Sequence, residues 1–170
     1  AQMLAEALRA RGIGRGDRVA LWLTAGAEQV SAILGCWMVG AAFCVLPSYA
    51  GRANSDRART RVEEVMSVLS PRLLVQGEQN SLPDSVTQRI ETLTFGSLKD
   101  IPLPGGDIGF GFPSRDPDDL AFIQFTSGST GGPAKGAEVR FGQLQSNLDA
   151  LAARIRMSNA DRMVSWAPLY

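Results

Sequence analysis

Residues 18–46 read RVALWLTAGAEQVSAILGCWMVGAAFCVL, and this stretch decides the fold class. Residues 18–23 form a short apolar run rich in strand-forming side chains, and residues 41–46 form a second one. Between them, residues 27–39 have the length and composition of a helix that ends at Gly40. Because parallel neighbours in a sheet are joined by such a crossover helix, we expect the two strands to pair in parallel.

The same alternation continues along the chain. Helices are predicted at residues 2–11, from Asn54 or Ser55 to Leu69, and over a stripe of Leu144, Leu148, Leu151 and Ile155. Strands are predicted at residues 72–76, 120–125, 137–140 and 162–166, with at most a short one near 91–95. The sequence therefore predicts an α/β fold with alternating strands and helices around a mainly parallel sheet.

We divide the chain into three predicted parts on this basis. Residues 1–76 form a first α/β subregion, residues 77–118 an irregular connecting segment rich in Gly, Pro and Asp, and residues 119–170 a second subregion. The second subregion consists of a strand, a glycine-rich loop, a helix and a final strand.

Composition excludes several classes of function. The 170 residues carry 17 Lys and Arg against 17 Asp and Glu, so no excess of positive charge is available for nucleic acid. The chain contains no His, which excludes a Ser-His-Asp relay and a zinc site built on imidazole. A hydrophobic content of 45% is typical of a folded domain.

Residues 29–51 carry no charged side chain and are long enough to span a bilayer. Gly35, Gly40 and Pro47 interrupt them, so a helix followed by a buried strand is favoured over a membrane span. Cys36 and Cys44 lie inside this stretch, without the spacing of a metal site or the number of a disulfide framework. We expect two buried thiols in a reducing, cytoplasmic setting.

One glycine-rich segment has a composition suited to phosphate. Residues 125–136 read FTSGSTGGPAKG and contain four hydroxyl side chains, four glycines and one lysine directly after a predicted strand. Glycines let backbone N–H groups approach an anion, hydroxyls donate to phosphate oxygens, and a lysine supplies a mobile charge. The segment is not a Walker A motif, because Lys135 precedes Gly136 and extended chain follows. Gly12, Gly14 and Gly16 precede a strand, so we interpret them as an ordinary loop.

Residues 125–136 resemble the signature loop of the adenylate-forming superfamily, which comprises acyl-CoA synthetases, fatty acyl-AMP ligases and peptide-synthetase adenylation domains. Residues 119–124 resemble the strand before that loop, and residues 16–21 and 40–42 resemble the N-terminal region. Residues 164–170 resemble the Trp-x-Pro-Leu-Tyr run of fatty acyl-AMP ligases. The likeness implies that the chain is an N-terminal fragment of the large domain of such an enzyme.

The resemblance implies activation of a carboxylic acid, with a fatty acid favoured, by ATP and Mg²⁺, followed by transfer to coenzyme A or an acyl carrier protein. The residues expected to hold the β and γ phosphates, with Lys135 in the catalytic role, are Thr126, Ser127, Gly128, Ser129, Thr130, Gly131 and Lys135. No metal ligand is assigned, because the family's carboxylate ligand is expected after Tyr170. The fragment alone is therefore expected to be inactive.

One departure from the family pattern leaves alternatives open. The family has Pro-Lys-Gly where this chain has Pro133-Ala134-Lys135-Gly136, which shifts Lys135 by up to about 3.5 Å of chain. A non-catalytic nucleotide- or anion-binding relative, with a loop altered by Ala134, is the alternative. A plain α/β domain with a Ser/Gly linker is the third interpretation.

Overall fold

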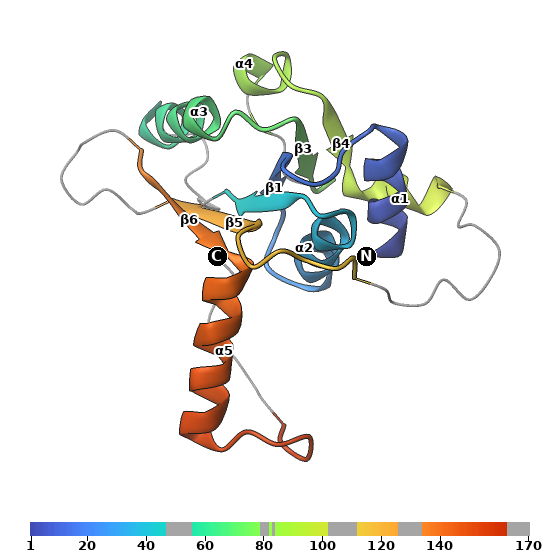
Figure 1. Ribbon diagram of the computed structural model, residues 1–170. Helices are drawn as coiled ribbons and strands as arrows, with labels where there is room; N and C mark the ends of the chain where they lie inside the picture. Colours follow the sequence, from blue (N-terminus) through green and yellow to red (C-terminus); the bar gives the residue numbers. More distant parts are fainter. Residues whose placement is uncertain (47–55, 79–81, 83, 102–111, 126–133, 163–170) are drawn as a thin grey trace.

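The structure is a computed structural model that describes the chain apart from residues 47–55, 79–81, 83, 102–111, 126–133 and 163–170. A six-stranded, mostly parallel sheet runs through it in the order β4-β3-β1-β2-β5-β6, with helices packed on it (Figure 1). This architecture confirms the predicted α/β class. In chain order the elements are α1 (Gln2–Ala10), β1 (Arg18–Trp22), α2 (Ala27–Val39), β2 (Ala42–Val45), α3 (Asp56–Leu69), β3 (Leu73–Gln76), α4 (Asp84–Thr87), β4 (Thr92–Thr94), the 3₁₀ helix η1 (Phe95–Asp100), β5 (Leu120–Phe125), β6 (Gly136–Arg140) and α5 (Phe141–Ile155).

The stretch that decides the fold forms the centre of the sheet. β1 pairs in parallel with β2, and four residue pairs define the register from Arg18↔Ala42 to Leu21↔Val45. β1 pairs in parallel with β3 on its other side, again over four residue pairs. Gly40 ends α2 with φ 79°, a left-handed conformation that glycine adopts at little cost. The predicted strand–helix–strand unit is confirmed.

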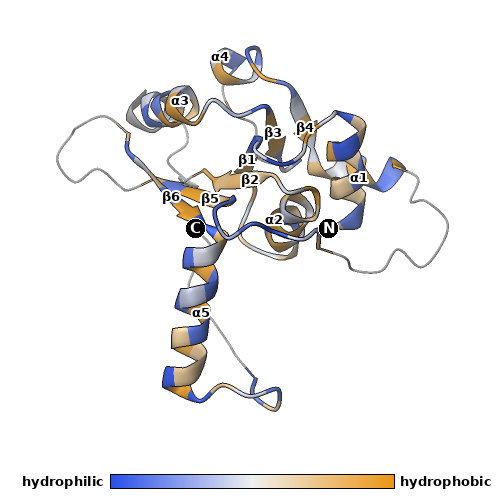
Figure 2. Cartoon of the chain, in the orientation of Figure 1, coloured by the Kyte–Doolittle hydropathy of each residue, from blue (hydrophilic) through white to orange (hydrophobic). Residues whose placement is uncertain are grey.

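Both faces of the central strands are buried, as a parallel sheet requires. Val19 and Leu21 face a core shared with α1 and α2, whereas Ala20 and Trp22 face a second core shared with α3 and α4. Trp22 is 7% exposed and the other three side chains are fully buried. The orange colour of the strands in Figure 2 reflects these apolar runs.

The predicted connecting segment contains more regular structure than its composition indicates. The short strand expected near residues 91–95 forms as β4, which pairs in parallel with β3 at the sheet edge. α4 and η1, which the sequence did not predict, also lie in this segment, and Leu93 and Leu98 are buried in the α1 and α2 core. The division into three parts at residues 76 and 118 remains a prediction.

The last described elements form a hairpin and a helix. β6 is antiparallel to β5, and β5 joins the rest of the sheet through one residue pair, Phe43↔Phe122. α5 follows directly and extends away from the rest of the molecule (Figure 1). The predicted apolar stripe exists, but α5 has no buried residue, and Leu148 and Leu151 are each 49% exposed.

The uncharged stretch begins in α2, which ends at Val39, and continues into β2. The favoured interpretation of a helix followed by a buried strand is thus confirmed. Among the described residues, no helix combines the length and the apolar character needed to cross a bilayer.

Candidate functional site

The candidate site lies at the closed end of the β5–β6 hairpin. Phe125 pairs with Gly136 and brings the two ends of the glycine-rich segment side by side. Of the predicted phosphate-binding residues, Thr126, Ser127, Gly128, Ser129, Thr130 and Gly131 lie outside the described part of the chain, so their contacts stay predictions. The structure describes the residues at the two ends of the segment, Phe125 on one side and residues 134–136 on the other, and we call them the base of the segment.

Gly136 lies at this base where an added side chain would be crowded. A Cβ atom there would lie 2.8 Å from Ile123 Cγ2 and 3.1 Å from Phe125 Cζ, both closer than ordinary van der Waals contact. Ala134 is 6% exposed and belongs to the same buried cluster as Ile123, on the α3 face of the sheet. The residue by which the chain departs from the family pattern is therefore packed in the core.

Lys135 lies between buried Ala134 and the start of β6, and it is exposed. It forms no hydrogen bond or ion pair with any residue that the structure describes. An exposed ammonium group without an internal partner can bind an external anion without first breaking an ion pair. Lys135 is the one predicted site residue whose position is described, and its role at the phosphates stays a prediction.

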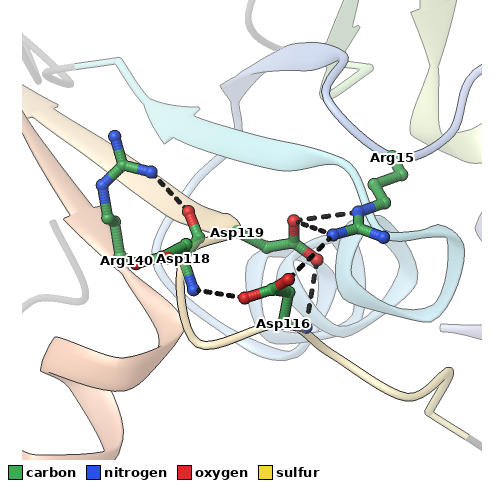
Figure 3. A network of polar contacts seen from close by, with 5 residues as sticks. All are labelled: Arg15, Asp116, Asp118, Asp119 and Arg140. Atoms are coloured by element: carbon green, nitrogen blue, oxygen red, sulfur yellow. Dashed lines mark hydrogen bonds and ion pairs between the residues drawn. The ribbon is translucent and has the colours of Figure 1, made fainter.

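The open end of the hairpin is joined to the N-terminal part of the chain by a polar network (Figure 3). Arg15, in the turn before β1, donates from Nε to Asp119 Oδ1 at 2.9 Å, and its Nη2 lies 3.6 Å from Asp116 Oδ2. Arg140, at the end of β6, donates to the backbone carbonyl of Asp118. The contact between Arg15 and Asp119 joins residues that lie 104 positions apart in sequence.

A second group of contacts lies beside this network. We call it the arginine–aromatic cluster, and its members are Trp37, Phe43, Phe112, Arg115, Phe122 and Phe141. Trp37 Nε1 donates to the carbonyl of Ala121 at 3.0 Å, and Arg115 Nη2 donates to the carbonyl of Trp37 at 2.7 Å. Desolvation lowers the pKa of Arg115, and the charge of Asp119 opposes that change.

The sequence did not predict Arg15, Arg115 or Asp119 as functional residues. Arg115 and Asp119 come from a segment rich in Pro and Asp, which indicates only a loop. Trp37 is partly buried against the core, and its indole N–H donates to the carbonyl of Ala121 in β5. No local pattern could have shown that these residues meet.

The two cysteines are not candidates for catalysis. Cys36 and Cys44 are buried free thiols, as expected. Burial raises the pKa of each to about 12, so both are protonated near neutral pH and poor nucleophiles. Among the described residues, no group of three or more His, Cys, Asp or Glu side chains gathers as a metal site would, and no magnesium ligand is assigned there.

Comparison with known proteins finds relatives of the entire chain. The chain is 33% identical to phenyloxazoline synthase MbtB of Mycolicibacterium paratuberculosis over 177 residues. The match covers 98% of this chain and 13% of that much longer protein.

Solved structures of three kinds share the fold. The structure of McyG A-PCP complexed with phenylalanyl-adenylate has a TM-score of 0.81 at 21% identity and covers 99% of this chain and 26% of that chain. A structure from studies of fatty acyl-adenylate ligases from E. coli and L. pneumophila has a TM-score of 0.79 at 25% identity, covering 99% and 30%. O-succinylbenzoate coenzyme A synthetase (MenE) from Bacillus subtilis, in complex with ATP and magnesium ion, has a TM-score of 0.78 at 21% identity, covering 99% and 42%.

The sequence pattern that defines one family extends over the entire chain. It is the family of AMP-binding enzymes, and it matches residues 1–170. Together with the relative at 33% identity over 98% of the chain, this match includes the hairpin and the sheet that supports it. The chain therefore belongs to the AMP-binding enzyme family, the adenylate-forming enzymes.

Proposed function

We propose that the full protein containing this chain converts a carboxylic acid and ATP into an acyl-adenylate and pyrophosphate. A carboxylate oxygen bonds to the α-phosphorus as the bond to the β-phosphate oxygen breaks, and pyrophosphate leaves with that electron pair. A thiol of coenzyme A or of a carrier protein then attacks the acyl carbonyl, and AMP leaves. The observation that carries the proposal is the match of the entire chain to the AMP-binding enzymes, with exposed Lys135 at the base of residues 126–135.

The residues of this chain act in the first step by positioning and by charge. Lys135 contributes a cation toward the β and γ phosphates, where negative charge accumulates as pyrophosphate departs. The hydroxyls and backbone N–H groups of residues 126–131 donate hydrogen bonds to phosphate oxygens. This step needs in-line geometry and charge stabilisation more than proton transfer, which agrees with a chain that contains no His. When bound, Mg²⁺ would neutralise part of the phosphate charge.

The acid is proposed in two classes. A fatty acid is favoured by residues 164–170, which resemble a run of fatty acyl-AMP ligases and lie outside the described residues. An amino acid is the second candidate, favoured by the 33% identity to phenyloxazoline synthase MbtB and by the shared fold with a phenylalanyl-adenylate complex. Both classes undergo the same first step, so one assay of that step, run with each acid in turn, shows which class the protein activates.

We further propose that residues 1–170 alone do not form an adenylate. The chain spans between 26% and 42% of the three solved chains whose fold it shares. Contacts to adenine, ribose and the acyl group are therefore expected from elsewhere in the protein. Carboxylate-dependent pyrophosphate exchange by the isolated 170-residue chain would contradict this proposal.

The test is carboxylate-dependent exchange of labelled pyrophosphate into ATP by the full-length protein, with fatty, aryl and amino acids supplied separately. Exchange with one class supports adenylation and identifies the acid. Absence of exchange with every acid, in a folded protein that still binds ATP, would support the non-catalytic alternative instead.

A further inference from the structure

The β5–β6 hairpin has few backbone bonds to the sheet that supports it. β1 shares four residue pairs with β2 and four with β3, whereas β5 shares one pair with β2. β6 pairs with β5. Because this backbone pairing is short, side-chain contacts also fix the orientation of the hairpin. Ile123 and Ala134 pack in the core on the α3 face, and a second set of contacts lies at the open end.

Those contacts converge on the C-terminal turn of α2. Trp37 holds the start of β5 through the bond from its Nε1 to the Ala121 carbonyl, and Phe43 stacks on Phe122 with ring centroids 5.6 Å apart. Phe141, the residue after β6, meets the edge of the Trp37 ring at 5.7 Å between centroids. Trp37, in the last turn of α2, therefore contacts both the start of β5 and the residue that follows β6, and Phe43 adds a contact from β2.

Arg115 is the polar centre of this attachment. Its guanidinium lies 4.1 Å from the centroid of the Phe141 ring and 5.0 Å from that of Phe112, and it donates to the Trp37 carbonyl at the end of α2. A helix C-terminus carries partial negative charge, and α2 has no basic residue in its own last turn. Arginines from outside the helix supply the compensating positive charge: Arg115 at the Trp37 carbonyl, and Arg9 at the Met38 carbonyl at 3.2 Å. A planar guanidinium can stack and donate at once, which an ammonium group cannot.

The neighbouring ion pair is less suited to this task. Arg15 is 66% exposed in its pair with Asp119, and exposed pairs contribute little because solvent screens them. Arg115 is half-buried and surrounded by rings, where each contact is stronger.

We propose that Arg115 is a positioning residue that fixes the orientation of the β5–β6 hairpin against α2 and thereby sets the position of Lys135. It does not touch substrate. Its effect on catalysis rests on the proposed function, whereas its effect on the hairpin does not.

The test compares Arg115→Ala and Arg115→Lys with Arg72→Ala in the full-length protein. Arg72 is a matched control, because its Nη1 also donates to a backbone carbonyl, that of Gly12 at 3.2 Å, and it pairs with Asp17. It directly precedes β3, which lies on the other side of β1 from the hairpin.

Two measurements are made on each variant. The first is amide hydrogen exchange, and the expected result is exchange at least about fivefold faster over residues 120–125 and 136–140 in Arg115→Ala, with a smaller change in Arg115→Lys. The second is pyrophosphate exchange, in which the KM for ATP rises about tenfold while the KM for the acid stays within about twofold. A purely structural loss would lower the maximal rate through the folded fraction and leave the KM for ATP unchanged.

The outcomes are separable. Hairpin amide exchange no faster in the Arg115 variants than in Arg72→Ala would overturn the positioning proposal, whatever the enzyme activity. Absence of pyrophosphate exchange in the unaltered protein would overturn the proposed function, and hydrogen exchange would still decide the role of Arg115.

Discussion

The central strands and the hairpin are stabilised in different ways. The strands β4, β3, β1 and β2 pair in parallel over several residues each, and β3, β1 and β2 are covered on both faces by apolar side chains. The β5–β6 hairpin shares one residue pair with that sheet and is attached by the buried side chains of Ile123 and Ala134 and, at its open end, by an arginine, an ion pair and aromatic rings. The helix α5, which follows it, has no buried residue. The first region provides a rigid support, and the second carries the candidate site. The predictions below test this difference.

The largest stability effect is expected in the central strands. Leu21 in β1 is 0% exposed, and Leu21→Ala should lower the free energy of unfolding by about 2–5 kcal/mol, because it leaves a cavity beneath α1 and α2. Chemical denaturation of the 170-residue chain measures this. A loss below about 1 kcal/mol would show that this core is loosely packed.

The two thiols report on the same region. With a pKa of about 12, Cys36 and Cys44 should react with iodoacetamide at pH 8 at least about 100-fold more slowly in the native protein than in denaturant. Folding raises the pKa of both thiols above the ordinary value of 9.0, so the folded state holds their protons more tightly than the unfolded state does. The contribution of the two protonated thiols to the free energy of unfolding is therefore complete below pH 9 and is lost as the pH rises toward 12. Rapid native alkylation at pH 8 would show that α2 and β2 open readily.

An intermediate effect is expected at the base of the hairpin. Gly136→Ala places a methyl group 2.8 Å from Ile123 Cγ2 and should cost about 1–3 kcal/mol, with faster amide exchange in β5 and β6. Gly14→Ala is the control, because its added Cβ would lie 3.7 Å from the nearest atom, the carbonyl oxygen of Val39. Equal losses for the two variants would refute the close-packed base.

The smallest effect is expected on α5. Leu148 is 49% exposed, so Leu148→Ala should change the stability of the 170-residue chain by less than about 0.5 kcal/mol. The same denaturation experiment measures it beside Leu21→Ala. A loss comparable to that of Leu21→Ala would mean that α5 is covered and that the contrast between the regions is wrong.

Most of the central region could be predicted from the sequence, because apolar runs and the glycine that ends a helix can be recognised within a short stretch of chain. The strands at residues 18–23 and 41–46 and their parallel pairing follow from such patterns. The sequence did not predict α4 and η1, which lie in a stretch with a high content of Gly, Pro and Asp. The Gly, Pro and Asp residues of this stretch indicated turns in the sequence. The burial of Leu93 and Leu98 could not be predicted, because it depends on tertiary packing.

The candidate site was predicted in part. Residues 125–136 could be identified because the chemistry of phosphate binding needs glycine, hydroxyl and lysine in a short segment. The burial of Ala134 and the meeting of Arg115 with Trp37 and Phe141 could not, since those contacts join segments distant in sequence. Periodicity also indicated an apolar stripe on α5 without revealing that three of its members, Leu148, Leu151 and Ile155, are about half exposed.

The central claim is that the hairpin presents Lys135 to the phosphates of ATP, and one comparison tests it directly. Carboxylate-dependent pyrophosphate exchange is measured for the full-length protein, for Lys135→Ala and for Lys99→Ala, an exposed lysine in η1 and the other lysine of this chain. We expect Lys135→Ala to lower the exchange rate by about 100-fold or more and Lys99→Ala to leave it within about twofold. Equal rates in the two variants, with exchange intact, would contradict the account.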